Sequence, residues 1–270
     1  MHLDRLRRGG SDPGGVISAT RGNHGQSIGY AGQVMGIPVT IVVPEGNSPE
    51  KNHLMRGFGV RLVVHGLDFE AARDEAFRLA AAEGLVFVPS FHPDLVLGVA
   101  SWALELFRAA PRLDALYVPI GLGSGICGAI RVRDLLGLAT EIIGVQAEGA
   151  DPYARSLAAG HPVVLNRSET LADGIAVRVP DPLAFEIIRA GVGRIVTVTD
   201  EEIAAAIRTY WEATHNLAEG AGAAGLAALL KEKDAQTRRR VGLVLTGGNI
   251  DLELFRSWVL GEPPRSSRRS

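Results

Sequence analysis

The 270-residue chain has room for one large domain or two modest ones, and its 46% hydrophobic and 21% charged residues are typical of a soluble globular protein. A formal net charge of -2 excludes a strongly basic surface for nucleic acid. The single cysteine, Cys127, excludes an internal disulfide and suits a reducing compartment. No apolar run reaches the roughly 20 residues of a membrane span, and the first residues do not resemble a signal peptide. We therefore expect a cytoplasmic protein without nucleic-acid or membrane partners.

Short apolar runs alternate with helical stretches along the chain. The stretch Asp68–Glu83 places apolar residues on one face, and Thr199 with Glu202 fits a capping box that opens a helix to about Thr214. Ala221–Lys231 is helical by alanine content. This alternation predicts an α/β fold with mainly parallel sheets flanked by helices. The predicted strands are Val16–Ala19, Val39–Val43, Val60–Val64, Leu85–Val88, Ala115–Pro119, Ile142–Gln146, Ile195–Val198 and Val241–Leu245.

The domain division is marked only weakly, because no Ser/Pro-rich linker separates two halves. The best candidate boundary is the break at Ala109-Ala110-Pro111, since the proline would end the preceding helix. We predict a small domain over residues 16–109 and a large domain over residues 110–260. Residues 261–270 are expected to form a disordered tail, and the family resemblance given below implies that residues 1–15 belong to the large domain.

Three glycine-rich turns follow predicted strands, where ligands of open α/β sheets bind. The first, Thr20–Ser27, opens a helix whose N-terminus suits a carboxylate or phosphate, and Asn23 suits a hydroxyl. A plain turn capped by Asn23 is an equal alternative. The second, Gly121–Gly125, predicts a phosphate-binding nest with the Ser124 hydroxyl. The third, Thr246–Asn249, places a hydroxyl where it could face a planar ring, although by itself this motif is better explained as a surface turn.

The second turn also matches the dinucleotide fingerprint through Gly123, Gly125 and Gly128. Glu148 follows the next predicted strand, where an acid that binds a ribose would belong. An NAD-dependent dehydrogenase is therefore an alternative, although one such match is weak in a chain with 33 glycines. The seven histidines show no zinc-ligand spacing, so we predict no metal site.

Five motifs, at residues 18–26, 118–125, 170–174, 219–224 and 246–249, together carry a resemblance to a known family. They resemble the serine/threonine dehydratases (threonine ammonia-lyases), which are fold-type-II pyridoxal-phosphate enzymes with a two-domain, tryptophan-synthase-β-like fold. The resemblance runs in the family's order from residue 16 to about residue 255 and makes the dehydrogenase the weaker alternative. It implies pyridoxal 5'-phosphate as cofactor, a small amino-acid substrate, and a homodimer or homotetramer.

The resemblance also implies roles for individual residues. Asn23 would hydrogen-bond the cofactor's 3-hydroxyl, Thr246 would face its pyridine nitrogen, and Glu219 would lie near its ring. The family converts L-threonine or L-serine to a 2-oxo acid and ammonia by β-elimination. The expected phosphate ligands are Gly121, Gly123, Ser124 and Gly125, and the expected substrate-binding residues are Thr20, Arg21, Gly22, Asn23 and His24.

One part of the family's pattern is missing. The Schiff-base lysine of the family lies in a Ser-Phe-Lys-x-Arg-Gly-like motif ahead of the asparagine that matches Asn23, which would place it before Met1. The three lysines present, Lys51, Lys231 and Lys233, are expected to be solvated surface residues. The chain is therefore expected to lack the N-terminal part of the large domain, to contain no catalytic residue, and to be inactive or very weak. A noncatalytic cofactor-binding remnant is the alternative.

Overall fold

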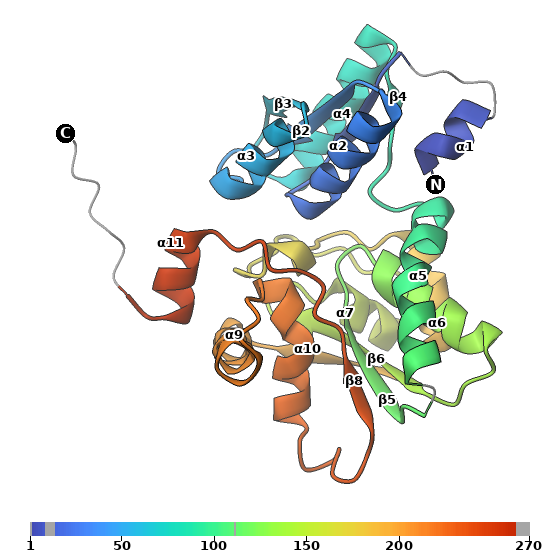
Figure 1. Ribbon diagram of the computed structural model, residues 1–270, viewed down its shortest axis with the longest axis vertical. Coiled ribbons are helices and arrows are strands. Elements are labelled where there is room, and N and C mark those ends of the chain that lie inside the picture. Colours follow the sequence, from blue (N-terminus) through green and yellow to red (C-terminus); the bar gives the residue numbers. More distant parts are fainter. Residues whose placement is uncertain (1, 9–13, 111, 263–270) are drawn as a thin grey trace. The chain divides into compact units, whose positions relative to one another are not determined.

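The structure is a computed structural model that describes residues 2–8, 14–110 and 112–262 (Figure 1). The chain divides into two units, residues 1–95 and 96–270, each built around its own parallel sheet. The division falls near the start of helix α5 (Pro93–Ala109), ahead of the predicted break at Ala109-Ala110-Pro111. The reason is packing: a Cβ on Gly128 of the second unit would lie 3.2 Å from Ala100 Cα, so most of α5 belongs to that unit.

The first unit contains a four-stranded sheet in the order β3-β2-β1-β4, and each pair of neighbouring strands is parallel. Val16 pairs with Val39 on one side and with Val86 on the other, which sets the register of the central strand. Every strand predicted for this region is present. The elements are α1 (His2–Arg8), β1 (Val16–Ala19), α2 (Asn23–Met35), β2 (Val39–Val43), α3 (Pro49–Gly57), β3 (Arg61–Val64), α4 (Phe69–Glu83) and β4 (Val86–Phe87).

Successive side chains of β1 and β2 point to opposite faces of this sheet, and both faces are covered. Ile17, Ala19 and Val42 pack with Ala72 and Ala76 of α4. Asp68 starts α4 as its N-cap, since its side chain accepts a hydrogen bond from the backbone N–H of Ala71. The opposite face packs against α2 and α3 through Val16, Val39, Ile41, Val43, Ile28 and Met55.

The second unit contains a four-stranded parallel sheet in the order β7-β6-β5-β8. The strands are β5 (Ala115–Pro119), β6 (Glu141–Ala147), β7 (Arg194–Val198) and β8 (Val241–Leu243). All four match strands expected from the sequence: β5 has the expected bounds, and the ends of the other three are shifted by one or two residues. The helices are α6 (Ser124–Leu135), α7 (Pro152–Ala159), α8 (Pro182–Gly191), α9 (Asp200–Thr214), α10 (Gly220–Lys231) and α11 (Leu252–Leu254), with short turns η1 (Asp173–Ile175) and η2 (Phe255–Val259).

Small residues let α10 lie directly on this sheet. A Cβ on Gly225 would lie 3.5 Å from the Tyr117 carbonyl oxygen of β5, and nearly every residue of the helix is buried. Helix α9 packs beside it and begins at the predicted capping box, in which Glu202 N donates to Thr199 Oγ1 and Thr199 N donates to Glu202 Oε2. The alanine-rich pattern and the box therefore predicted both helices correctly.

The first residues of the chain depart from expectation. Leu3 of α1 is buried in the same hydrophobic cluster as Val16 and Ile28, so α1 packs with the first unit. The family resemblance implied that residues 1–15 belong to the large domain, whereas the packing of Leu3 places α1 in the first unit. Most of the expected disordered tail, residues 261–270, lies outside the described residues.

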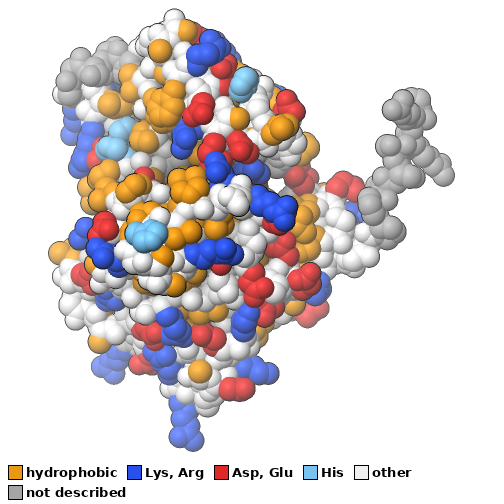
Figure 2. All heavy atoms as spheres, turned by 180° about the vertical axis from the view of Figure 1, so that it is seen from behind, with side chains coloured by type: hydrophobic (Ala, Val, Ile, Leu, Met, Phe, Trp, Pro, Cys, Tyr) orange, Lys and Arg blue, Asp and Glu red, His pale blue; other side chains and the backbone are white. Residues whose placement is uncertain are grey.

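The surface agrees with the charge balance of the sequence. Basic and acidic side chains are intermingled on the face drawn in Figure 2, as a net charge of -2 leads one to expect. Among residues 2–8, 14–110 and 112–262, no helix has the length and apolar character that crossing a membrane requires.

Lys231 is exposed at the surface, as expected, and it also connects several elements. Its Nζ donates to the Thr197 carbonyl oxygen at 3.0 Å and lies 3.2 Å from Glu202 Oε2 and 3.4 Å from Glu148 Oε1. Burial acts to lower the pKa of Lys231, but the two carboxylates outweigh burial and the pKa is raised. Lys233 is exposed, as expected. The ammonium of Lys231 therefore links the end of α10 to residues in or next to β6, β7 and α9.

We expect Lys231→Met to lower the free energy of unfolding by about 1 kcal/mol, because three acceptors lose their cationic partner. The effect is small because the Lys231 side chain is 37% exposed, so water partly screens its charge. Urea denaturation measures this change. Lys233→Met is the matched control, since it removes the same charge from an exposed neighbour. Equal losses in the two variants would contradict the role given to Lys231.

Candidate functional site

The turn Gly121–Gly125 joins buried strand β5 to the first turn of α6. Gly123 precedes the helix with φ of 104°, in the left-handed region that favours glycine. The N–H groups of a first helical turn have no acceptor within their helix, so they are available to an anion. A Cβ placed on Gly125 would meet no described atom within 4 Å. The turn thus has donors and open space beside them, as the predicted phosphate nest requires.

A buried tyrosine holds this turn in place. Tyr153 at the start of α7 is fully buried, and its hydroxyl donates to the Leu122 carbonyl oxygen at 2.8 Å. The same hydroxyl accepts a hydrogen bond from the Asp181 backbone N–H at 3.1 Å. Burial raises the pKa of Tyr153, so the hydroxyl remains protonated and continues to donate. Sequence reasoning missed this residue because nothing in its spacing indicates a contact with a turn 31 residues earlier.

Close backbone approaches bring the motifs of the second unit together. A Cβ on Gly121 would lie 2.7 Å from the Gly174 carbonyl oxygen, and a Cβ on Gly174 would lie 3.7 Å from Glu219 Oε1. A Cβ on Gly222 would lie 2.3 Å from the Gly247 carbonyl oxygen, which also accepts a hydrogen bond from Glu219 N at 3.0 Å. A neighbouring backbone therefore requires glycine at positions 121 and 222, the Ala221 side chain requires it at position 174, and motifs distant in sequence form one structure.

Two of the predicted cofactor-binding residues lie on this structure. Glu219 is 2% exposed and precedes the first residue of α10. Thr246 is exposed and follows β8, whose neighbour in the sheet is β5. Because β5 and β8 are parallel, Thr246 and the Gly121–Gly125 turn lie at the same edge of the sheet, beyond the carboxyl ends of the strands. Binding of a cofactor by these residues stays a prediction.

The first unit carries the remaining predicted residues on the turn between β1 and α2. Thr20 is buried, and its Oγ1 accepts a hydrogen bond from Gly22 N at 2.9 Å, which fixes the start of the turn. A Cβ on Gly25 would lie 2.5 Å from Met55 Sδ, so α2 lies close against α3. Arg21 is half-buried, and its Nε is buried without a hydrogen-bond partner in the part of the chain that the structure describes.

Lys51 is buried, so the prediction of a solvated side chain was wrong. Only 3% of the residue is exposed, and a Cβ on Gly22 would lie 2.3 Å from Lys51 Cδ. The residue is placed by the start of α3, where the Lys51 N–H donates to the N-cap oxygen Ser48 Oγ at 3.0 Å. The Ser48-Pro49 pair is a sequence signal for that helix start, but not for the contact with Gly22. The aliphatic stem of Lys51 thus leaves room only for glycine at position 22.

His24 lies in the first turn of α2 with an imidazole nitrogen removed from solvent. Its Nε2 is buried and has no hydrogen-bond partner among the described residues. The pKa of His24 is lowered to about 4, chiefly by burial; a hydrogen bond with the Pro89 backbone acts to raise it, and the charge of His2 acts to lower it. The ring is therefore neutral at neutral pH, and it can meet a ligand by hydrogen bonding but not as a cation.

We expect Gly22→Ala to destabilise the protein by about 1–3 kcal/mol, because its Cβ would overlap the Lys51 stem. Lys51→Ala removes that stem, so the double variant should lose less than the sum of the two single losses in urea denaturation. Gly57→Ala in α3 is the control, since its Cβ would meet no described atom within 4 Å. Strict additivity would contradict the contact.

The buried His24 should make stability depend on pH. Its pKa of about 4 lies below the ordinary value of 6.5, so the unfolded chain binds more protons between these values. The stability is complete above about pH 6.5 and is lost as the pH falls toward 4. Between pH 7 and pH 4, the wild type should lose up to about 3 kcal/mol more than His24→Asn. His161→Asn, at an exposed histidine, is the control and should lose as much stability as the wild type. If His24→Asn showed the same pH dependence of stability as the wild type, His24 would not be its cause.

Comparison with solved structures shows the fold of the chain. Threonine deaminase isoform 2 of Solanum lycopersicum is similar with a TM-score of 0.86 and 29% identity, over 92% of this chain and 73% of that one. Maize serine racemase is similar with a TM-score of 0.85 and 26% identity, over 93% and 78%. These proteins confirm the predicted fold-type-II architecture of parallel sheets flanked by helices.

Comparison with curated sequences shows the family. The L-threonine ammonia-lyase of Thermotoga maritima is 36% identical over 242 residues, which are 89% of this chain and 60% of that protein. The L-threo-3-hydroxyaspartate ammonia-lyase of Saccharomyces cerevisiae is 30% identical over 92% of this chain and 76% of that protein. The chain thus spans about three fifths of the Thermotoga relative. Residues 1–247 match the family model described as pyridoxal-phosphate dependent enzyme, and the chain belongs to that family.

Proposed function

We propose that these residues form the cofactor- and substrate-binding part of an enzyme that removes the β-hydroxyl and amino groups of L-threonine or L-serine. The products are a 2-oxo acid and ammonia. The proposal rests on one observation: four segments that are distant in the sequence lie close together in the second unit. They are the Gly121–Gly125 turn, Gly174, Glu219 and the Thr246–Asn249 turn. The ammonia-lyases among the relatives support the same reaction type.

The second unit fits the cofactor through its glycine turn. Pyridoxal phosphate, when bound, supplies an electron sink for bond cleavage beside the nitrogen of an amino acid. Gly121, Gly123 and Gly125 would offer backbone N–H groups to its phosphate, and Ser124 would add a hydroxyl. The open space at Gly125 supports this assignment, because a phosphate needs room beside those donors. Thr246 would offer the ring nitrogen a neutral hydroxyl, which does not enforce protonation there.

The first unit fits the carboxylate of an amino acid. The turn Thr20–His24 opens α2, whose N-terminus carries a positive partial charge. The buried Nε of Arg21 supports an anionic ligand, since guanidinium groups bind carboxylates by charge-assisted hydrogen bonds. Neutral His24 would add a hydrogen bond without a charge. Glycine at position 22, required by Lys51, lets a ligand approach the backbone.

The positions of the three lysines do not support a covalent bond between one of them and the cofactor. Lys51 has its stem against Gly22, Lys231 is engaged with two carboxylates, and Lys233 is exposed. We therefore propose that the 270-residue chain binds pyridoxal phosphate without a covalent bond, and we assign none of its residues to proton abstraction. The alternative of a nicotinamide enzyme also has little support, because Glu148, the residue expected to bind the ribose, is paired with Lys231.

Pyridoxal phosphate binding to the purified chain tests this assignment. Gly125→Asp should weaken binding at least about tenfold in equilibrium dialysis, because a carboxylate would fill the open space and repel the phosphate. Gly125→Asn occupies the same volume without the charge and should lose less. Equal affinity of wild type and Gly125→Asp would place the phosphate elsewhere. Borohydride treatment should leave no pyridoxyl group on the chain, and a stable group on any lysine would contradict noncovalent binding.

A further inference from the structure

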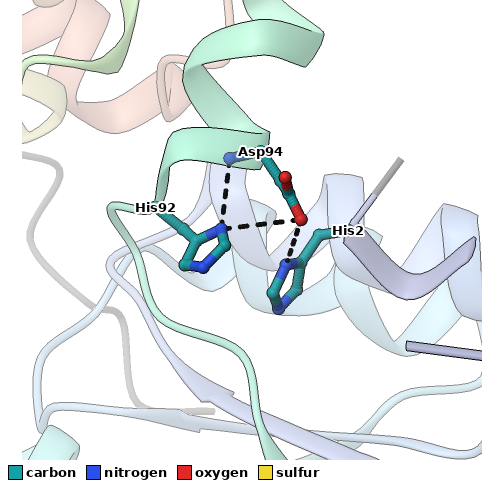
Figure 3. A group of neighbouring side chains, drawn as sticks. All are labelled: His2, His92 and Asp94. Carbon is teal, nitrogen blue, oxygen red and sulfur yellow. Dashed lines mark hydrogen bonds and ion pairs between the residues drawn. The ribbon is translucent and has the colours of Figure 1, made fainter. Parts of the chain in front are cut away.

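Two histidines and an aspartate of the first unit meet around one carboxylate oxygen. His2 begins α1, and His92 and Asp94 lie at the turn into α5 (Figure 3). His2 Nδ1 lies 3.1 Å from Asp94 Oδ2, and His92 Nδ1 lies 3.7 Å from the same oxygen. Figure 3 shows both rings directed toward that oxygen, and the two ring centroids lie 4.5 Å apart. No step of the proposed function uses these residues.

The spacing of the three donor groups is close to that of a tetrahedral metal site. Zinc bonds of about 2.0–2.1 Å to nitrogen and oxygen give a tetrahedron with edges of about 3.3 Å. The two separations at Asp94 Oδ2, 3.1 and 3.7 Å, lie on either side of that value. One ligand atom from each of the three residues lies within 4.8 Å of the other two. Small side-chain rotations therefore suffice to place one ion among them.

The hydrogen bonds show which ring nitrogens carry a lone pair. The Asp94 backbone N–H donates to His92 Nδ1 at 3.1 Å, so this nitrogen is unprotonated and in the form that binds a metal. His2 Nδ1 donates to the carboxylate, which can only accept. Metal binding would move that proton to Nε2, the other tautomer of the neutral ring. Two imidazole nitrogens and one carboxylate oxygen form a donor set that suits zinc.

Asp94 is held in the orientation that a ligand needs. Its side chain is 7% exposed, and Arg5 of α1 pairs with Oδ1, which leaves Oδ2 facing the histidines. Such support of a ligating carboxylate is usual around metal ions. Burial acts to raise the pKa of Asp94, but the hydrogen bond from His2 and the charge of Arg5 outweigh it and lower the pKa. The carboxylate is thus an anion at neutral pH.

We propose that His2, His92 and Asp94 bind one divalent transition-metal ion of the zinc class, with a water molecule as fourth ligand. The ion would join α1 to the turn before α5 within the first unit, where Leu3 already packs in the hydrophobic core. None of the three residues is among the proposed cofactor and substrate residues, although the charge of His2 acts on His24, and the site stands whether or not the proposed reaction is correct.

Zinc binding to the full chain without a histidine tag tests the site. Competition with a chromophoric chelator at pH 7.5 should show one zinc ion bound per chain. His2→Gln and His92→Gln should each weaken binding more than about 100-fold, because each removes a ligand. Glutamine at position 2 can still donate to Asp94, so α1 can keep its contact. Exposed His161→Gln is the matched control and should bind as the wild type does.

Cobalt provides an independent measurement of the geometry. Co²⁺ added to the wild type should give the intense visible absorption of a tetrahedral site, and the two glutamine variants should lack it. Circular dichroism checks that each variant is folded. The proposal is overturned if the folded wild type binds no zinc, or if zinc binding survives in both His2→Gln and His92→Gln.

Discussion

The close approach of the Gly174 carbonyl oxygen to Gly121 is the contact on which the second unit's site depends. It allows no side chain at position 121 and sets the distance between the turn after β5 and the segment that precedes α8. Gly174 in turn lies beside Glu219, which is joined to Gly247 by a hydrogen bond. Four segments spread over nearly half of the chain, from Gly121 to Gly247, are thereby fixed by close contacts, most of them with backbone atoms.

Local pattern was sufficient to predict most of this fold. Runs of mostly apolar residues predicted the eight strands that the described residues form, because the inner strands of a parallel sheet are covered on both faces. The edge strand β3, with exposed Arg61, is less completely covered. The Thr199–Glu202 box and the alanines after residue 220 gave the helices, since capping and propensity act within a few residues. The glycine turns also lie where the sequence placed them, because ends of parallel strands share an edge.

What the sequence did not reveal depends on contacts between distant segments. Lys51 was expected in solvent because lysines seldom are buried, and only the tertiary contact with Gly22 shows the exception. The cluster of His2, His92 and Asp94 has no ligand spacing in the sequence, since 92 residues separate two of its members. The boundary between the units was placed too late for a similar reason. The sequence indicates where helix α5 ends, but it does not indicate which hydrophobic core that helix packs against.

The hydrogen bond from Tyr153 to the Leu122 carbonyl oxygen has a consequence for the orientation of the next peptide group. In a trans peptide the carbonyl and the following N–H point in opposite directions. Tyr153 therefore directs the N–H of Gly123 away from itself before any ligand arrives. An anion that binds at this turn would meet a donor already oriented, and no part of its binding free energy would be consumed in rotating the backbone.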